Sequence, residues 1–310
     1  MSKELQLEKK KEISWSEAWG LTKTIFKEYF SESSFRHAAA LAYYAIFSLV
    51  PLLYLAVYFF GRFLGNDTVY QLTNDFFQNQ VGMKDSSGIM EVISMYDVEK
   101  RQPLMEFIGI VVLLFVSTAF ITTLRKSINE FMGIRKVKVA AKHLIFKSII
   151  ARLLSIAFIG FFGTIIIVIY FSQTVLISIG KDFIENPTLQ FLIQNGLTHV
   201  ASIFSNFLIF TLLFKYVHDG IVKWKPAMYG AILTALLVYF GQIIIKFYLT
   251  HYFMGANGGV IGSILVILAW IFYTGQIIFL GAKFVKIYSK MIGEPIKSSY
   301  LKFKKKSNLA

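Results

Sequence analysis

The chain has 310 residues, of which 55% are hydrophobic, and its mean hydropathy is +0.58. This apolar excess is typical of an integral membrane protein and excludes an ordinary soluble domain. The absence of cysteine excludes disulfides, thiolate metal sites and cysteine nucleophiles. A formal charge of +14 would suit nucleic acid, but in a membrane protein it must first be divided between the two faces of the membrane.

The N-terminal segment, residues 1–37, begins with polar residues and has no short apolar run followed by a cleavage site, so we expect no cleaved signal. From Trp15 to Tyr29, apolar residues recur at helical spacing and lysines lie between them. This pattern predicts an amphipathic helix at the cytoplasmic membrane interface. A helix packed beneath the transmembrane bundle would show the same pattern, and this alternative stays open.

The first predicted span covers residues 38–61, a run without Asp, Glu, Lys or Arg that is longer than the roughly 20 residues needed to cross a bilayer. Residues 62–106 are rich in acids and contain glycine and proline breakers, which predicts an outer cap of short helices. The second span, residues 107–124, is of minimal length. It is followed by a basic loop, residues 125–152.

The third predicted span, residues 153–180, is uncharged throughout. The next uncharged run begins at Asn186, but Pro187 and several polar residues make its first third unsuited to a helix in lipid, so the fourth span is assigned to residues 197–214. Whether residues 186–196 form a re-entrant segment stays open.

The fifth span is predicted at residues 226–245, with Pro226 in a position that favours the start of a helix. The last uncharged run is too long for one crossing and opens with glycine-rich residues. It therefore predicts a turn or re-entrant segment over 247–259 and a sixth span over 260–282. A basic tail, residues 283–310, completes the chain.

The basic residues predict the orientation of these six spans. Of the 32 lysines and arginines, 26 fall in the two terminal segments and in the loops 125–152 and 215–225. The positive-inside rule therefore places both termini in the cytoplasm. The expected fold is all-α, and the topology explains the charge without nucleic acid. The basic face should attract anionic lipid headgroups.

Three segments resemble a known family: AAALAYYAIFSLVPLL at 38–53, KPAMYGAILTALL at 225–237, and GANGGVIGSILVILAWIFYTGQIIFLGAKF at 255–284. They are similar to the YihY and virulence factor BrkB family of bacterial inner-membrane proteins over about residues 20–290. The resemblance implies six spans in the inner membrane, an old ribonuclease BN label, and lipid or envelope transport among the proposed roles. Family members commonly end the last span with Gly-Ala-Glu, whereas this chain has Gly281, Ala282 and Lys283, so no role is carried over for that acid.

Polar and aromatic residues in the predicted spans are candidates for lining a cavity or a polar pathway. Tyr44, Ser48 and Pro51 share one helix face. Helix packing is the alternative interpretation for that face. Asn206 and Gln242 are buried amides that could line a polar pathway, and interhelical hydrogen bonds are the alternative interpretation for them. The complete candidate set is Tyr43, Tyr44, Ser48, Pro51, Asn206, Gln242, Tyr273 and Gln276.

Small residues in the last two spans predict helix contacts. Gly230, Thr234 and Gly241 share a face of the fifth span, and we interpret them as a packing seam. Gly258, Gly259 and Gly262 either pack helices or form a hinge. The candidates for binding lipid headgroups are Arg125, Lys126, Arg135 and Lys136.

Three functional hypotheses follow from these patterns. The first is a transporter or flippase-like protein for a lipid or other amphipathic envelope molecule; the second is a scaffold that holds an envelope protein through the cap. Membrane-tethered ribonuclease activity ranks last, because the five histidines are isolated, although His218 and Asp219 are neighbours in a turn interpreted as solvated. We expect no enzyme activity, cofactor or metal site. The uncharged span centres and the missing P-loop disfavour proton coupling and ATP hydrolysis.

Overall fold

A computed structural model describes residues 15–31, 33–48, 65–77, 87, 90–91, 103–134, 187–251 and 259–298. Most of these residues are helical. The described helices are α1 (Trp15–Ser31), an unlabelled helix over 34–48, α3 (Asn66–Phe76), α5 (Pro103–Phe131), α7 (Pro187–Tyr216), α8 (Trp224–His251) and α9 (Gly259–Met291). Two short strands, β1 (Gly220–Ile221) and β2 (Lys297–Ser298), pair in antiparallel fashion.

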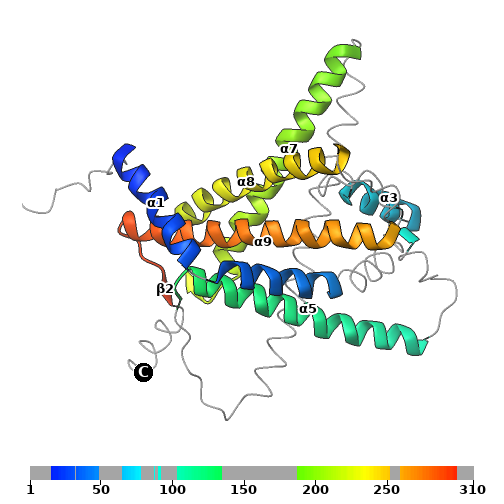
Figure 1. Cartoon of the computed structure of the whole chain (residues 1–310), viewed down its shortest axis with the longest axis horizontal. Coiled ribbons are helices and arrows are strands. Elements are labelled where there is room, and N and C mark those ends of the chain that lie inside the picture. The colour runs from blue at the N-terminus through cyan, green and yellow to red at the C-terminus, as the bar shows by residue number, and fades with distance from the viewer. Residues whose placement is uncertain are drawn as a thin grey trace, which may run out of the picture.

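Helix α9 lies at the centre of the arrangement, in contact with α1, α5, α7 and α8 (Figure 1). The helix over 34–48 also approaches it closely, because a Cβ atom on Gly275 would lie 3.4 Å from the Cβ of Ala38. Helix α1 lies near the C-terminal end of α9, whereas α3 lies near the opposite end (Figure 1). The cap helix and the N-terminal helix therefore occupy opposite ends of the bundle.

Glycines of the fifth predicted span lie at the contact between α8 and α9. A Cβ atom on Gly230 would lie 2.2 Å from a methyl carbon of Val285, and one on Gly241 would lie 2.0 Å from the ring of Tyr273. Thr234 faces Gly281 of α9 in the same way. Since real Cβ atoms do not approach so closely, glycine at these positions lets the backbones of α8 and α9 come together.

Helices α5 and α9 end in the same motif at the same end of the bundle. Gly133 and Gly293 have φ angles of 69° and 74°, a region that favours glycine. After α5, the amide of Ile134 donates to the carbonyl of Asn129 at 2.8 Å; after α9, the amide of Glu294 donates to the carbonyl of Ser289 at the same distance. This Schellman pairing satisfies carbonyls that a helix end would leave unpaired.

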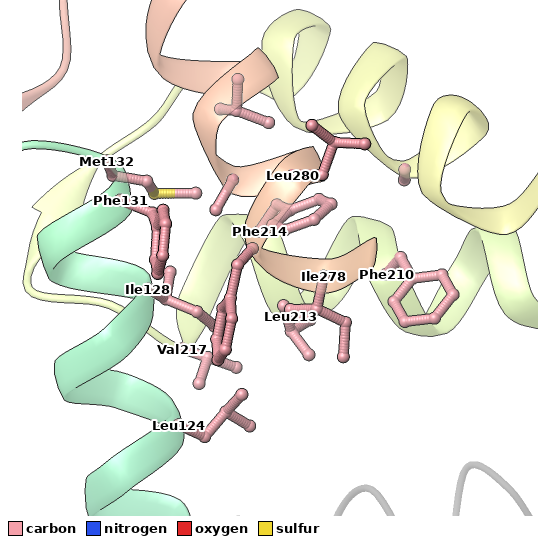
Figure 2. Close-up of a cluster of buried hydrophobic side chains, with 14 of the residues drawn as sticks. Leu124, Ile128, Phe131, Met132, Phe210, Leu213, Phe214, Val217, Ile278 and Leu280 are labelled. Carbon is pink, nitrogen blue, oxygen red and sulfur yellow. The ribbon is translucent and has the colours of Figure 1, made fainter. Parts of the chain in front are cut away.

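The apolar core lies where α5, α7 and α9 meet (Figure 2). Phe131 and Phe279 stack with ring centroids 4.9 Å apart and with planes 5° apart. Both rings, together with Phe214, are fully buried. The labelled core residues in Figure 2 are Leu124, Ile128, Phe131, Met132, Phe210, Leu213, Phe214, Val217, Ile278 and Leu280.

Two helices in the described part of the chain are long and apolar enough to cross a membrane, Trp224–Tyr248 and Ile264–Met291. They correspond to the fifth and sixth predicted spans, and Ser202–Tyr216 is a shorter apolar helix within the fourth. Residues 107–124 form part of α5. The third span, residues 153–180, and the second half of the first lie outside the described residues, so the six-span count stays a prediction.

The segment before the fourth predicted span, which the sequence left open, is helical from Pro187 onward, because α7 is one continuous helix from that residue to Tyr216. Proline at the first position of a helix needs no backbone N–H partner, so it begins the helix instead of breaking it. At the other uncertain segment, α8 continues to His251 and α9 begins at Gly259, and residues 252–258 lie outside the described ranges.

The predicted amphipathic helix is present as α1, and it packs against α9. Ile25 and Tyr29 are buried, whereas Phe26 and Phe30 of α1 are exposed. Packing against the bundle therefore accounts for one part of the apolar face and leaves another part uncovered.

The all-α expectation missed the strand pair β1 and β2. Gly220 pairs with Ser298 and Ile221 with Lys297, which joins the turn between α7 and α8 to the segment after α9. Two-residue strands are too short for any alternation of apolar and polar residues to be recognised in a sequence.

Candidate functional site

The candidates from the first predicted span face different environments. Tyr43 is 58% exposed and lies against the ring of Phe47, with centroids 4.8 Å apart. Tyr44 is half-buried, and Ser48 is buried with its hydroxyl donating to the carbonyl of Ala45 at 2.8 Å. Pro51 lies outside the described residues. In this span Ser48 and part of Tyr44 therefore lie inside the bundle, whereas Tyr43 points outward.

The candidates from the later spans lie on α7, α8 and α9, and two of them make hydrogen bonds to other helices. The hydroxyl of Tyr273 donates to the carbonyl of Leu237 at 2.7 Å, so this hydrogen bond joins α9 to α8. Gln276 accepts a hydrogen bond at Oε1 from the Tyr29 hydroxyl of α1, and its Nε2 has no partner among the described residues. Gln242 is buried in α8, and Asn206 is half-buried in α7.

A charge cluster at the junction of α1 and α9 was not predicted as a unit. Lys283 is 0% exposed, and its Nζ lies 3.4 Å from Oε2 of Glu28, while Nζ of Lys286 lies 3.2 Å from the same oxygen. Partial burial raises the pKa of the Glu28 carboxyl, but the two ammonium groups outweigh burial and hold that pKa below its usual 4.5. The sequence feature that indicates this cluster is Lys283, a lysine that follows directly on the apolar residues of the last predicted span.

Beside this cluster, His37 joins the helix over 34–48 to α5. Its Nδ1 lies 2.8 Å from the hydroxyl of Ser127, and its Nε2 lies 3.3 Å from a carboxylate oxygen of Glu130. The imidazole also meets the rings of Phe131 and Phe279 edge-on, at 5.6 and 6.1 Å. Ser127 is fully buried, so this serine–histidine–carboxylate set ties two helices together and offers no accessible nucleophile.

The interpretation of His218 and Asp219 as a solvated turn is wrong. His218 is only 6% exposed; its Nε2 lies 2.7 Å from the carbonyl of Phe214, and its Nδ1 accepts the amide of Gly220 at 3.1 Å. Burial lowers the pKa of this imidazole. A neutral ring with its proton on Nε2 satisfies both contacts, whereas a second proton on Nδ1 would break the contact with Gly220.

Asp219 is held by α5. Asn129 donates to its Oδ2 at 2.7 Å and accepts its backbone amide at 2.9 Å, while Arg125 pairs with the other carboxylate oxygen. These groups satisfy the polar atoms of Asp219, which is half-buried beside the buried His218. Sequence reasoning missed the arrangement, since Asn129 and Asp219 are separated by 90 positions.

The candidates for headgroup binding are divided by these contacts. Arg125 has a carboxylate partner in Asp219 and so carries less uncompensated charge than its sequence position suggested. Lys126 is exposed on α5, and Arg135 and Lys136 lie outside the described residues. Within the described ranges, no three or more acidic or histidine side chains are grouped closely enough to hold a metal ion.

Comparison with known proteins places the chain in a family. No solved structure matches it. A UPF0761 membrane protein of Saccharophagus degradans is 23% identical over 267 residues, which cover 84% of this chain but only 58% of that protein. The chain therefore spans less than two thirds of that relative's length. The sequence model of the virulence factor BrkB family matches residues 25–300. The chain belongs to the virulence factor BrkB family and is a membrane protein.

Proposed function

We propose that this chain is a six-span protein of the bacterial inner membrane, with both termini in the cytoplasm, that moves a lipid or another amphipathic envelope molecule. The polar part of the cargo contacts side chains of α7 and α9. The basic cytoplasmic face attracts an anionic headgroup, and the apolar helices accommodate the hydrocarbon part.

One observation carries the proposal: polar atoms in the bundle that have no hydrogen-bond partner in the described part of the chain. Seven buried side-chain atoms of the described residues are in this position, and three of them, Nδ2 of Asn206, Oγ1 of Thr274 and Nε2 of Gln276, belong to α7 and α9 within the predicted spans. Each such atom costs several kcal/mol in hydrocarbon, about as much as a lost hydrogen bond in an apolar medium. A polar cargo group or the water that accompanies it would supply the missing partners.

The test compares lipid retention and lipid movement in matched variants. Native mass spectrometry of gently extracted protein should show a selectively retained lipid class, which is lost in Asn206→Leu and Gln276→Leu. The matched control is Thr211→Val, because Thr211 lies on the same helix as Asn206 but its hydroxyl already donates to the carbonyl of Phe207 at 2.7 Å.

Proteoliposomes that contain the wild-type chain should also move fluorescent lipid between leaflets faster than protein-free vesicles, and both leucine variants should slow this movement. Retention of bulk lipids in bulk proportions, together with movement no faster than in protein-free vesicles, would reject transport. The acidic cap around α3, where Asp67 and Asp75 are exposed, would then be the surface to test for a scaffolding role.

A further inference from the structure

Helix α1 presents three distinct stripes along its length. The first, Ile25 and Tyr29, is buried against the bundle. The second is aromatic and uncovered: Phe26 is 47% exposed and Phe30 is 62% exposed, and their rings stack with centroids 6.2 Å apart. The third consists of Lys23 and Lys27, both exposed one turn apart.

The order of these stripes around the helix is informative. At 100° per residue, the phenylalanines lie between the buried stripe and the lysines. A helix lying flat at a bilayer surface needs this order: its apolar face enters the acyl boundary, and flanking lysines reach the phosphates. A fully water-exposed helix would gain nothing from two uncovered phenylalanines.

Glu28, which lies beside the buried stripe, fixes the position of α1 along the bundle. Glu28 contacts Lys283 and Lys286, which belong to the C-terminal part of the candidate span Ile264–Met291. That end of the span also carries Lys290, and the segment after it pairs through β2 with β1 in the turn between α7 and α8. Helix α1 is therefore held near the end of a membrane-spanning helix, where headgroups lie.

The exposed aromatic surface continues beyond α1. Phe35, at the start of the next helix, is 59% exposed and lies with its ring centroid 6.2 Å from that of Phe272 on α9. The exposed surface formed by Phe26, Phe30 and Phe35 therefore extends from α1 to α9, and phenylalanine is a residue that interfacial helices place on their apolar face.

We propose that α1 is bound to the surface of an anionic bilayer, with Phe26 and Phe30 inserted at the acyl boundary and with Lys23 and Lys27 contacting lipid phosphates. The occupant of this surface is a lipid monolayer, because the uncovered stripe is aromatic and its flank is cationic. The inference is independent of the proposed transport, since it concerns how α1 is held and not what the bundle carries.

The test uses single nitroxide labels on the full-length protein, which has no cysteine of its own. Cysteine is introduced at Phe26, at Phe30, or at Thr24 as the reference; Thr24 is exposed, and its hydroxyl bonds only to the nearby carbonyl of Gly20 in the described structure. The variants are reconstituted in nanodiscs that contain phosphatidylglycerol. Labels at 26 and 30 should be relaxed by oxygen and shielded from an aqueous nickel chelate, whereas a label at 24 should show the reverse.

A second arm tests the charge. Two lysines near an anionic surface favour the inserted state roughly 30-fold in total. In the Phe30 label background, K23Q/K27Q should therefore raise the exposure of the label to nickel, as should nanodiscs of neutral lipid. K290Q, which removes an exposed lysine from α9, is the matched control and should leave the label shielded.

Equal nickel exposure at positions 24, 26 and 30 would overturn the proposal, and so would shielding at 26 and 30 that is unaffected by the lysine substitutions and by neutral lipid. Labels at 26 and 30 that are shielded from oxygen as well as from nickel would point to a protein contact instead and would also reject it.

Discussion

Lys283 is the residue whose surroundings most constrain this protein. A fully buried ammonium group is costly unless it is paired, and here its partner, Glu28, comes from a helix 255 positions away in sequence. The ring of Phe131, whose centroid is 5.9 Å from Nζ, adds a favourable contact for the charge. The lysine therefore requires α1 to be docked, and α1 is part of the folded bundle.

Removing the carboxylate tests this dependence. Glu28→Gln should lower the stability of the protein in detergent by about 2 kcal/mol, less than a fully buried pair would lose because the Glu28 side chain is 42% exposed. The readout is the thermal unfolding midpoint. Glu294→Gln, which breaks the exposed pair with Lys223, should change the midpoint far less.

The pH dependence of the same contact has a definite sign. Because the folded-state pKa of Glu28 lies below 4.5, its contribution to stability is complete above that pH and is lost as the pH falls through the lower, folded-state value. The midpoint difference between wild type and Glu28→Gln should therefore shrink in acid. A difference that stays constant down to pH 3, or a variant as stable as wild type at pH 7, would contradict this role for Glu28.

At the scale of elements, glycine determines how α8 and α9 pack. A Cβ atom on Gly281 would lie 2.0 Å from the hydroxyl of Thr234 and 2.7 Å from the ring of Phe214, so any side chain there must push two helices away from α9. Gly241 accepts the ring of Tyr273 in the same manner at the next contact along the seam.

Alanine at Gly281 should destabilise the protein by roughly 1–3 kcal/mol, the usual cost of overpacking a well-packed interior. Gly196→Ala in α7 is the control, because nothing lies within 4 Å of a Cβ atom there, and alanine should be neutral or stabilising by up to about 1 kcal/mol through helix propensity. Thermal midpoints of both variants in the same detergent check the prediction. Equal midpoints would show that the seam does not limit the approach of the helices.

At the scale of the whole molecule, the distribution of charge predicts which end of the bundle faces the cytoplasm. The turn between α7 and α8 and the segment after α9 are joined by β1 and β2, so the two regions must lie on one side of the membrane. The cap helix α3 lies at the other end of α9 (Figure 1).

Cysteine labelling in intact cells tests this topology. A membrane-impermeant maleimide should label D75C in α3 from outside, whereas K297C in β2 should react only after the cells are opened. Both positions are exposed, so burial does not confound the comparison. Labelling of both from the same side would reject the six-span topology with cytoplasmic termini.

Much of the fold could be predicted from the sequence because the signals are local. Each correctly predicted feature depends on residues close together in the chain. These features are the fifth and sixth spans, Pro226 in the first turn of α8, and the glycine face of α8. The family resemblance is also confirmed, since the matched region covers residues 25–300. The sequence left the structure of residues 186–196 open, and α7 begins at Pro187, a position in which proline favours the start of a helix.

The candidate site could be predicted only in part. The sequence predicts that Asn206, Gln242 and Gln276 lie within the bundle, because each is surrounded by apolar residues in its helix. It does not predict their hydrogen-bond partners. Tyr43 and Tyr44 are adjacent and equally polar, yet one is exposed and the other half-buried, because a helix turns its neighbours 100° apart.

By itself, the sequence determined that this protein is helical and belongs to the membrane, because apolar run length and charge are properties of single segments. Only the tertiary structure decided that Glu28 neutralises Lys283, that Asn129 and Arg125 hold Asp219, and that α1 keeps an aromatic stripe uncovered. The physical reason is that each of these features depends on the distance between side chains far apart in the chain, and packing sets that distance.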